Sequence, residues 1–69
     1  MSSSDFPEPQ LTRQQELAHD IHNCLHVIAE GLEVLKLVRH DQAKFDDTCA
    51  VLEKERRQAS KLVNELANL

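Results

Sequence analysis

The sequence contains very few of the residues that build large cores or interrupt helices. Its 69 residues include no tryptophan or tyrosine and only two phenylalanines, Phe6 and Phe45. A single glycine and two prolines leave few positions at which a helix would be forced to end. Hydrophobic residues still make up 41% of the chain, which is too high a share for simple disorder. Together these proportions predict one small all-α domain.

Other absences exclude whole functional classes. The chain has eight basic and twelve acidic residues, and this balance is the opposite of what a nucleic-acid-binding surface needs. No apolar run approaches the roughly 18 residues of a membrane-spanning helix, and the N-terminus lacks the features of a signal peptide. We therefore expect a cytoplasmic protein. Cys24 and Cys49 lack metal-binding or redox spacing and are expected to be reduced thiols.

The apolar residues form two helical series that differ in phase. Residues 1–10 are polar, contain both prolines and are expected to form a flexible N-terminal arm. Thr12 and Gln15 then fit a capping box that opens the first helix. Its apolar seam, with spacings of three and four residues after the first position, is Leu11, Ala18, Ile21, Leu25, Ile28, Leu32 and Leu35, with Leu17, Cys24 and Val38 alongside.

The second series restarts in another phase and predicts a second helix. Its seam consists of Phe45, Cys49, Leu52, Ala59, Val63 and Leu66, with Leu62 and Leu69 alongside. Extending the first register would instead place Arg39, Gln42 and Asp46 in the seam. The phase break across residues 39–44 therefore predicts a turn near His40-Asp41-Gln42, with Asp41 capping the second helix. Residues 11–69 are expected to form an antiparallel helical hairpin.

A hairpin of this size rarely closes a stable core by itself. Two hairpins that pair across their seams would form a four-helix bundle and so bury the exposed apolar residues. The sequence thus predicts a homodimer. Within the second seam, Arg56 occupies a position where an apolar residue would be expected. We expect it to extend toward Glu53 or Glu55, or to specify register.

One polar stripe on the first predicted helix carries a coherent set of chemical groups. His19 and Asn23 lie about 40° apart on one helical face, and Asp20 adjoins them. An exposed imidazole is largely neutral near neutral pH and is therefore nucleophilic. Asp20 is placed to fix its tautomer and receive its proton, and Asn23 to orient water or phosphate. The same residues would also suit an ordinary solvated helix face.

A metal site is the main chemical alternative for this stripe. His19, His22 and His26 lie within about 60° of one another around the helix. His19 and His26, however, are separated by about 10 Å along the helix axis, which is too far for one ion to bridge well. We therefore expect neither a metal ion nor another cofactor.

The segment His19-Asp-Ile-His-Asn-Cys-Leu25 resembles the H-box of sensor histidine kinases, in the form H-[DE]-[IL]-x-N-x-L. That motif belongs to their dimerisation and histidine-phosphotransfer (HisKA-like) domains, and the resemblance covers roughly residues 11–69. It implies that His19 is the phosphoacceptor, Asp20 its acid/base partner and Asn23 the residue that positions water or phosphate. It also implies that the outer surface of the first helix docks a receiver domain, with Val27, Val34 and Leu37 as apolar contacts.

The sequence departs from that family in three ways, one of which is that Gly31 stands one place later than the glycine of many members. Cys24 stands where many members have a proline that kinks the helix, so a straighter helix is expected here. The 69 residues also leave no room for the family's ATP-binding domain, so this domain is not expected to bind ATP by itself. Either it is an excised piece of a larger kinase, or it is a standalone protein that accepts phosphate from a separate kinase domain or exchanges it with a receiver aspartate. Two functional interpretations remain: a phosphotransfer and dimerisation module of two-component signalling, or a non-catalytic adaptor or decoy that dimerises or binds a signalling partner.

Overall fold

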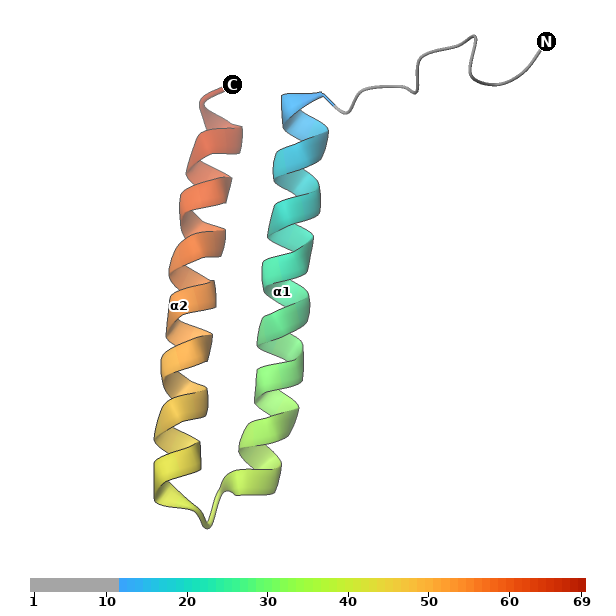
Figure 1. Cartoon of the computed structure of the whole chain (residues 1–69). Coiled ribbons are helices and arrows are strands. Elements are labelled where there is room, and N and C mark those ends of the chain that lie inside the picture. The colour runs from blue at the N-terminus through green and yellow to red at the C-terminus, as the bar shows by residue number, and fades with distance from the viewer. Residues whose placement is uncertain (1–11) are drawn as a thin grey trace, which may run out of the picture.

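The computed structural model describes residues 12–69, which form two antiparallel helices joined by a short turn (Figure 1). Helix α1 spans Arg13–Val38 and helix α2 spans Gln42–Ala67, each with 26 residues. No strand occurs in this part of the chain, and the two helices pack against each other along their length. The predicted all-α helical hairpin is therefore confirmed. The predicted arm, residues 1–10, and Leu11 lie outside the described residues.

Side-chain caps fix where each helix begins. The Thr12 hydroxyl accepts a hydrogen bond from the Gln15 backbone N–H at 3.1 Å, and Gln15 Oε1 accepts one from the Thr12 N–H at 3.0 Å. This reciprocal pair is the predicted capping box. At α2, Asp41 Oδ1 accepts a hydrogen bond from the Lys44 N–H at 3.1 Å. Because its carboxylate satisfies a backbone donor that has no partner within the helix, Asp41 ends the turn and starts α2 without glycine or proline.

The packed interior of the hairpin is small. Leu17, Cys24 and Leu62 are the only buried side chains among the described residues, with exposures of 0%, 6% and 7%. They are surrounded by three partly buried residues, Ile21, Ala59 and Leu66. Two long helices in contact along one line bury only a narrow stripe, so most of their apolar surface is left outside this interior.

The buried residues are those that the sequence pattern places alongside the two seams. Leu17 and Cys24 precede the seam positions Ala18 and Leu25, and Leu62 precedes Val63. Some seam residues are exposed, with Leu25 at 54%, Leu32 at 51% and Val63 at 48%. Others, among them Ile21, Ala59 and Leu66, are partly buried and pack against the interior. The contact between α1 and α2 is therefore shifted toward the flanking positions Leu17, Cys24 and Leu62, and it keeps only part of the predicted seam. One apolar edge of each helix packs inside the hairpin, and the other remains exposed.

Gly31 allows α1 and α2 to lie close together near the turn. A β-carbon at this position would overlap the Leu52 side chain of α2. Glycine is unfavourable inside a helix by about 1 kcal/mol relative to alanine, so its presence here has a packing explanation. Arg13 Nη2 and Glu65 Oε2, 2.7 Å apart, link the other ends of the two helices, but both side chains are about half exposed and such pairs stabilise little.

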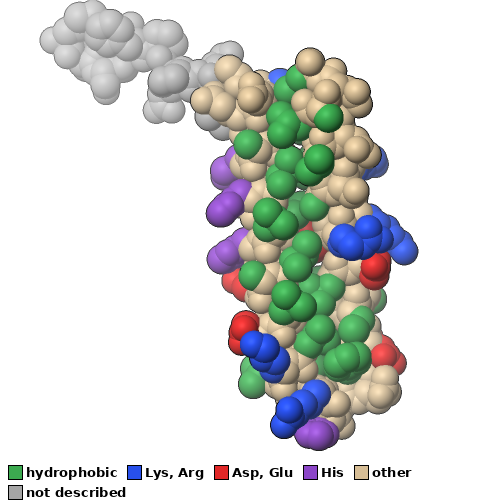
Figure 2. Space-filling model, turned by 180° about the vertical axis from the view of Figure 1, so that it is seen from behind, with side chains coloured by type: hydrophobic (Ala, Val, Ile, Leu, Met, Phe, Trp, Pro, Cys, Tyr) green, Lys and Arg blue, Asp and Glu red, His purple; other side chains and the backbone are tan. Residues whose placement is uncertain are grey.

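One face of the hairpin carries a continuous apolar stripe that extends over both helices (Figure 2). We call it the apolar face. It includes a groove lined by residues of both helices, namely Ile28, Leu32, Cys49, Leu52, Glu53 and Arg56. Leu25 lies on the same side of α1 as Ile28 and Leu32 because helical spacings of three and seven residues return to one side. Neither described helix is long and apolar enough to cross a membrane.

We expect Leu17→Ala to lower the free energy of unfolding by about 3 kcal/mol, because it opens a cavity at the most buried side chain. The matched control is Leu37→Ala, since Leu37 is 83% exposed and its removal should change stability by about 0.5 kcal/mol or less. Urea unfolding followed by circular dichroism measures both. Equal losses in the two variants would contradict the assignment of the interior to the stripe around Leu17.

Candidate functional site

The three histidines of α1 project from the outer edge of the hairpin, beside the apolar stripe in Figure 2. His19 lies about 200° around the helix from the buried Leu17, and 67% of its side chain is exposed. Neither the neighbouring helix nor the apolar face therefore covers it. The capping box holds the first turn of α1 and so fixes the start of the helix on which His19 lies.

Asp20 and Asn23 both approach the same nitrogen of the His19 ring. Asp20 Oδ1 lies 3.8 Å from His19 Nδ1, and Asn23 Nδ2 lies 3.5 Å from it. The structure thus brings the three predicted site residues together on one exposed patch. Within residues 12–69 no hydrogen bond or ion pair reaches the other ring nitrogen, Nε2. That atom is the one open to an incoming group.

The two contacts require different tautomers of His19. The Asn23 amide donates to Nδ1 only when that nitrogen has no proton, whereas the Asp20 carboxylate accepts from Nδ1 only when it has one. At 3.8 Å the carboxylate is beyond hydrogen-bond range, so a rotation of its exposed side chain is needed to close that contact. In the tautomer that Asp20 favours, Nε2 carries the lone pair and can act as a nucleophile.

The other two histidines of α1 are arranged differently. His26 Nε2 lies 3.1 Å from Glu30 Oε1, one turn further along the helix, and both side chains are 68% exposed. His22 is exposed. Across residues 12–69, no three His, Cys, Asp or Glu side chains are grouped closely enough to hold a metal ion. The geometry therefore gives the histidine stripe no ligand set for zinc or copper.

Cys24 follows Asn23 in sequence but points into the hairpin interior. Burial raises the pKa of its thiol, and hydrogen bonding to Glu55 together with the negative charges of Glu55 and Asp20 raises it further. A thiol with a raised pKa is mostly protonated near neutral pH and is therefore a poor nucleophile. Both cysteines are free. We assign Cys24 to packing rather than to the chemistry of the adjacent motif.

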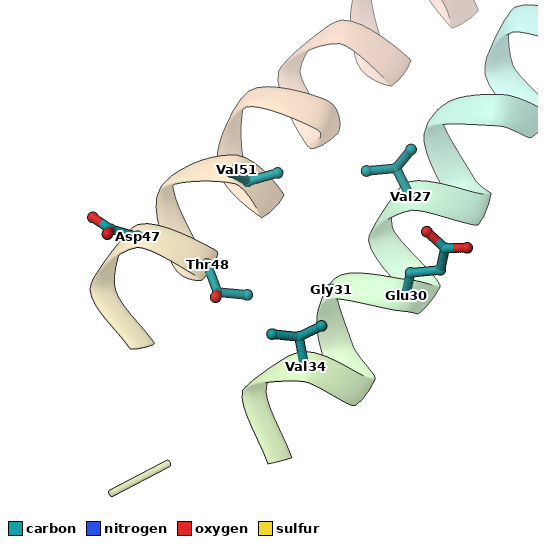
Figure 3. Close-up of a pocket in the computed structure, with 7 residues that line it drawn as sticks. All are labelled: Val27, Glu30, Gly31, Val34, Asp47, Thr48 and Val51. Carbon is teal, nitrogen blue, oxygen red and sulfur yellow. The ribbon is translucent and has the colours of Figure 1, made fainter. Parts of the chain in front are cut away.

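A second groove lies between α1 and α2 on the side opposite the apolar face (Figure 3). Its lining combines the apolar residues Val27, Gly31, Val34 and Val51 with Thr48 and two acidic residues, Glu30 and Asp47. Val27 is the lining residue nearest to His19 in the sequence. It lies eight residues after His19, which corresponds to about 12 Å along the helix axis. Val27 and Val34 are two of the three apolar residues predicted to lie outside the seam, whereas Leu37 is not part of this groove.

The α2 side of the Figure 3 groove was not identified from the sequence. Asp47, Thr48 and Val51 come from the second helix and are brought to α1 by the hairpin fold. The sequence feature that could have indicated it is Val51, an apolar residue that is out of phase with the seam of its own helix.

Comparisons with known proteins provide no family for this chain: no family model, no curated protein and no solved structure matches it. A functional assignment therefore depends on the geometry and chemistry of these residues.

Proposed function

We propose that this hairpin is a histidine phosphoacceptor and dimerisation module that acts in two-component signalling in the cytoplasm. In this proposal His19 carries a phosphoryl group between a separate kinase ATP-binding domain and the aspartate of a response-regulator receiver domain. The observation that carries the proposal is the arrangement around His19. Its ring is 67% exposed, and both Asp20 and Asn23 approach Nδ1, so that Nε2 is left accessible.

In the proposed phosphoryl transfer, His19 Nε2 is the nucleophile and the Asp20 carboxylate supports the opposite ring nitrogen. His19 Nε2 attacks the phosphorus of the donor, an N–P bond forms, and the P–O bond to the leaving group breaks. That leaving group is ADP when the donor is ATP, or the receiver carboxylate when a phosphorylated receiver donates. The Asp20 carboxylate accepts a hydrogen bond from Nδ1–H and stabilises the positive charge that develops on the ring. In the onward step a carboxylate oxygen of the receiver attacks phosphorus, and the N–P bond breaks.

Asn23 would act beside the same ring nitrogen. Its amide is 3.5 Å from Nδ1 and lies one turn beyond His19 on the same exposed patch. An amide can both donate and accept hydrogen bonds, so it is suited to orient a phosphoryl oxygen or a water molecule. We therefore propose Asn23 as a positioning residue for the phosphoryl group, or for the water that removes it from a receiver partner.

The groove of Figure 3 is the proposed docking site for the receiver. It has an apolar floor on the side of α1 that Asn23 also faces, and it begins about 12 Å from His19. Glu30 and Asp47 give it an acidic rim, which favours a partner with basic residues around an apolar surface. A domain seated there would lie close enough to extend a carboxylate toward His19.

The apolar face is the proposed dimerisation surface. Large apolar side chains rarely remain about half exposed along a whole helix pair unless a partner covers them. A second copy that packed on this face would complete a four-helix bundle and leave both the His19 patch and the Figure 3 groove open. The homodimer and the receiver would then use opposite sides of the hairpin.

The decisive test of the phosphoacceptor is His19→Gln. Incubation with a cognate histidine kinase domain, or with a phosphorylated receiver, should give acid-labile label on the wild type and none on this variant. His22→Gln and His26→Gln are matched controls on the same helix and should keep the label. Label retained by His19→Gln, or lost from a control that remains helical by circular dichroism, would contradict the assignment.

Asp20→Asn tests the proton partner separately. The substitution keeps the size and polarity of the side chain but removes the negative charge, so the rate of phosphoryl transfer should fall by about a hundredfold or more. Rapid-quench measurement of phosphohistidine formation gives this rate. Glu16→Gln is the control because Glu16 is also an exposed carboxylate near the start of α1 and should leave the rate unchanged. An unchanged rate in Asp20→Asn would exclude the acid/base role.

Leu32→Glu and Val34→Glu separate the two proposed surfaces. Both residues are exposed apolar side chains of α1, but Leu32 lines the apolar face and Val34 lines the Figure 3 groove. Leu32→Glu should convert dimer to monomer in sedimentation equilibrium because it buries a charge between two copies. Val34→Glu should remain dimeric and yet slow transfer to the receiver. The opposite pattern, or loss of the dimer in both variants, would show that the faces are wrongly assigned.

A non-catalytic adaptor or decoy is the second candidate function. The long apolar stripe favours it, because hydrophobic contact alone can bind a partner without phosphoryl transfer (Figure 2). This second function predicts different results for the same variants. An adaptor should keep partner binding and cellular activity in His19→Gln and lose both in Leu32→Glu.

A further inference from the structure

The apolar face contains one charged pair. Arg56 and Glu53 line its groove together with Ile28, Leu32, Cys49 and Leu52. The guanidinium of Arg56 donates three hydrogen bonds to the Glu53 carboxylate: Nε to Oε1 at 3.1 Å, Nε to Oε2 at 3.3 Å and Nη2 to Oε2 at 3.1 Å. Figure 2 shows basic and acidic side chains together beside the stripe on its α2 side. The pair therefore interrupts a surface that is otherwise suited to hydrophobic contact.

Arg56 occupies a position that an apolar residue would fill more stably. It follows Cys49 and Leu52 at helical spacing and precedes Val63 by seven residues, so it lies in line with the apolar residues of α2. A polar residue in such a line weakens association but restricts which partner and which register are accepted. Arg56 also lowers the pKa of Glu53, so the carboxylate stays ionised throughout the neutral range.

The position of the pair along the hairpin points to a second copy as its partner. Helix α2 runs from Gln42 to Ala67, so Glu53 and Arg56 flank the midpoint of the helix. Two copies that bury the whole stripe must overlap fully. A twofold axis then brings the middle of one stripe level with the middle of the other, whether the two hairpins point the same way or opposite ways. Each copy presents one positive and one negative charge at that level, so the two middles are complementary.

We propose that Glu53 and Arg56 exchange partners between two copies of this chain, so that a four-charge cluster at the centre of the apolar face makes self-association selective. This inference rests on the dimerisation part of the proposed function and does not involve His19. In the isolated hairpin the two side chains pair within one helix and remain 50% and 60% exposed. In the dimer the Glu53 carboxylate of each copy faces the Arg56 guanidinium of the other.

Charge reversal provides a test that includes its own rescue. Arg56→Glu places four negative charges at the centre of a dimer, and Glu53→Arg places four positive charges there. Each variant alone should dissociate with a dimer dissociation constant at least about tenfold above that of the wild type, because like charges are opposed. An equimolar mixture of the two variants brings the two negative charges of one copy against the two positive charges of the other. It should form a heterodimer with affinity close to that of the wild type, measured by sedimentation equilibrium and native mass spectrometry.

The matched control is Lys54→Glu, which makes the same change in net charge at the middle of α2 on a residue outside the groove. It should leave the dimer unchanged. Circular dichroism of every sample shows whether a variant fails to fold alone. Two unfolded variants that become helical on mixing support the proposal. Two variants that stay unfolded on mixing overturn it.

The results also distinguish the role of the charged pair from the proposed dimerisation and phosphoacceptor functions. A dimeric wild type whose affinity is unaffected by Arg56→Glu or Glu53→Arg would overturn the role of the charged pair and leave the apolar face as the dimer surface. A monomeric wild type at high concentration would overturn both, while label on His19 would still stand as a separate result.

Discussion

The structure depends on a single line of contact between two helices. Leu17, Cys24 and Leu62 fill that line, and they are the only described side chains with exposures below one-tenth. A contact this narrow occupies one side of each helix and leaves the remaining sides of α1 free for other purposes. Three buried side chains are a small core for a domain of this size, and the proposed dimer would add to it by covering the apolar face.

The free sides of α1 carry different chemistry in different directions. The apolar face holds Leu25 and Leu32, the outer edge holds His19, and the opposite side opens into the groove that contains Val27. These directions follow from helical spacing alone, since Leu25 and Val27 differ by about 200° around the axis. A partner on one side therefore does not obstruct the others. This separation would allow the proposed dimer contact, the exposed His19 ring and the proposed receiver-docking groove to be used at the same time.

Much of this arrangement could be predicted from the sequence, and the exceptions have a common cause. The capping box at Thr12, the cap at Asp41 and the two phases of apolar residues determine two helices and the turn between them. The sequence pattern alone could not determine which of two adjacent apolar positions faces the neighbouring helix. Leu17 and Ala18 both fit a helical stripe, and only the relative rotation of α1 and α2 decides that Leu17 is buried. The α2 side of the Figure 3 groove has the same origin, because Val51 meets α1 only at that rotation.

The sequence pattern locates the His19 patch but not the detail of its contacts. Helical spacing places His19, Asp20 and Asn23 together, but it does not show that the carboxylate and the amide compete for one ring nitrogen. The amide contact at 3.5 Å favours the tautomer in which Nε2 keeps its proton, and the carboxylate at 3.8 Å would favour the tautomer with a lone pair on Nε2 only after a rotation brings it closer. A partner that moves Asp20 toward Nδ1, or draws Asn23 away to a phosphoryl oxygen, would shift the ring to the reactive tautomer as it docks.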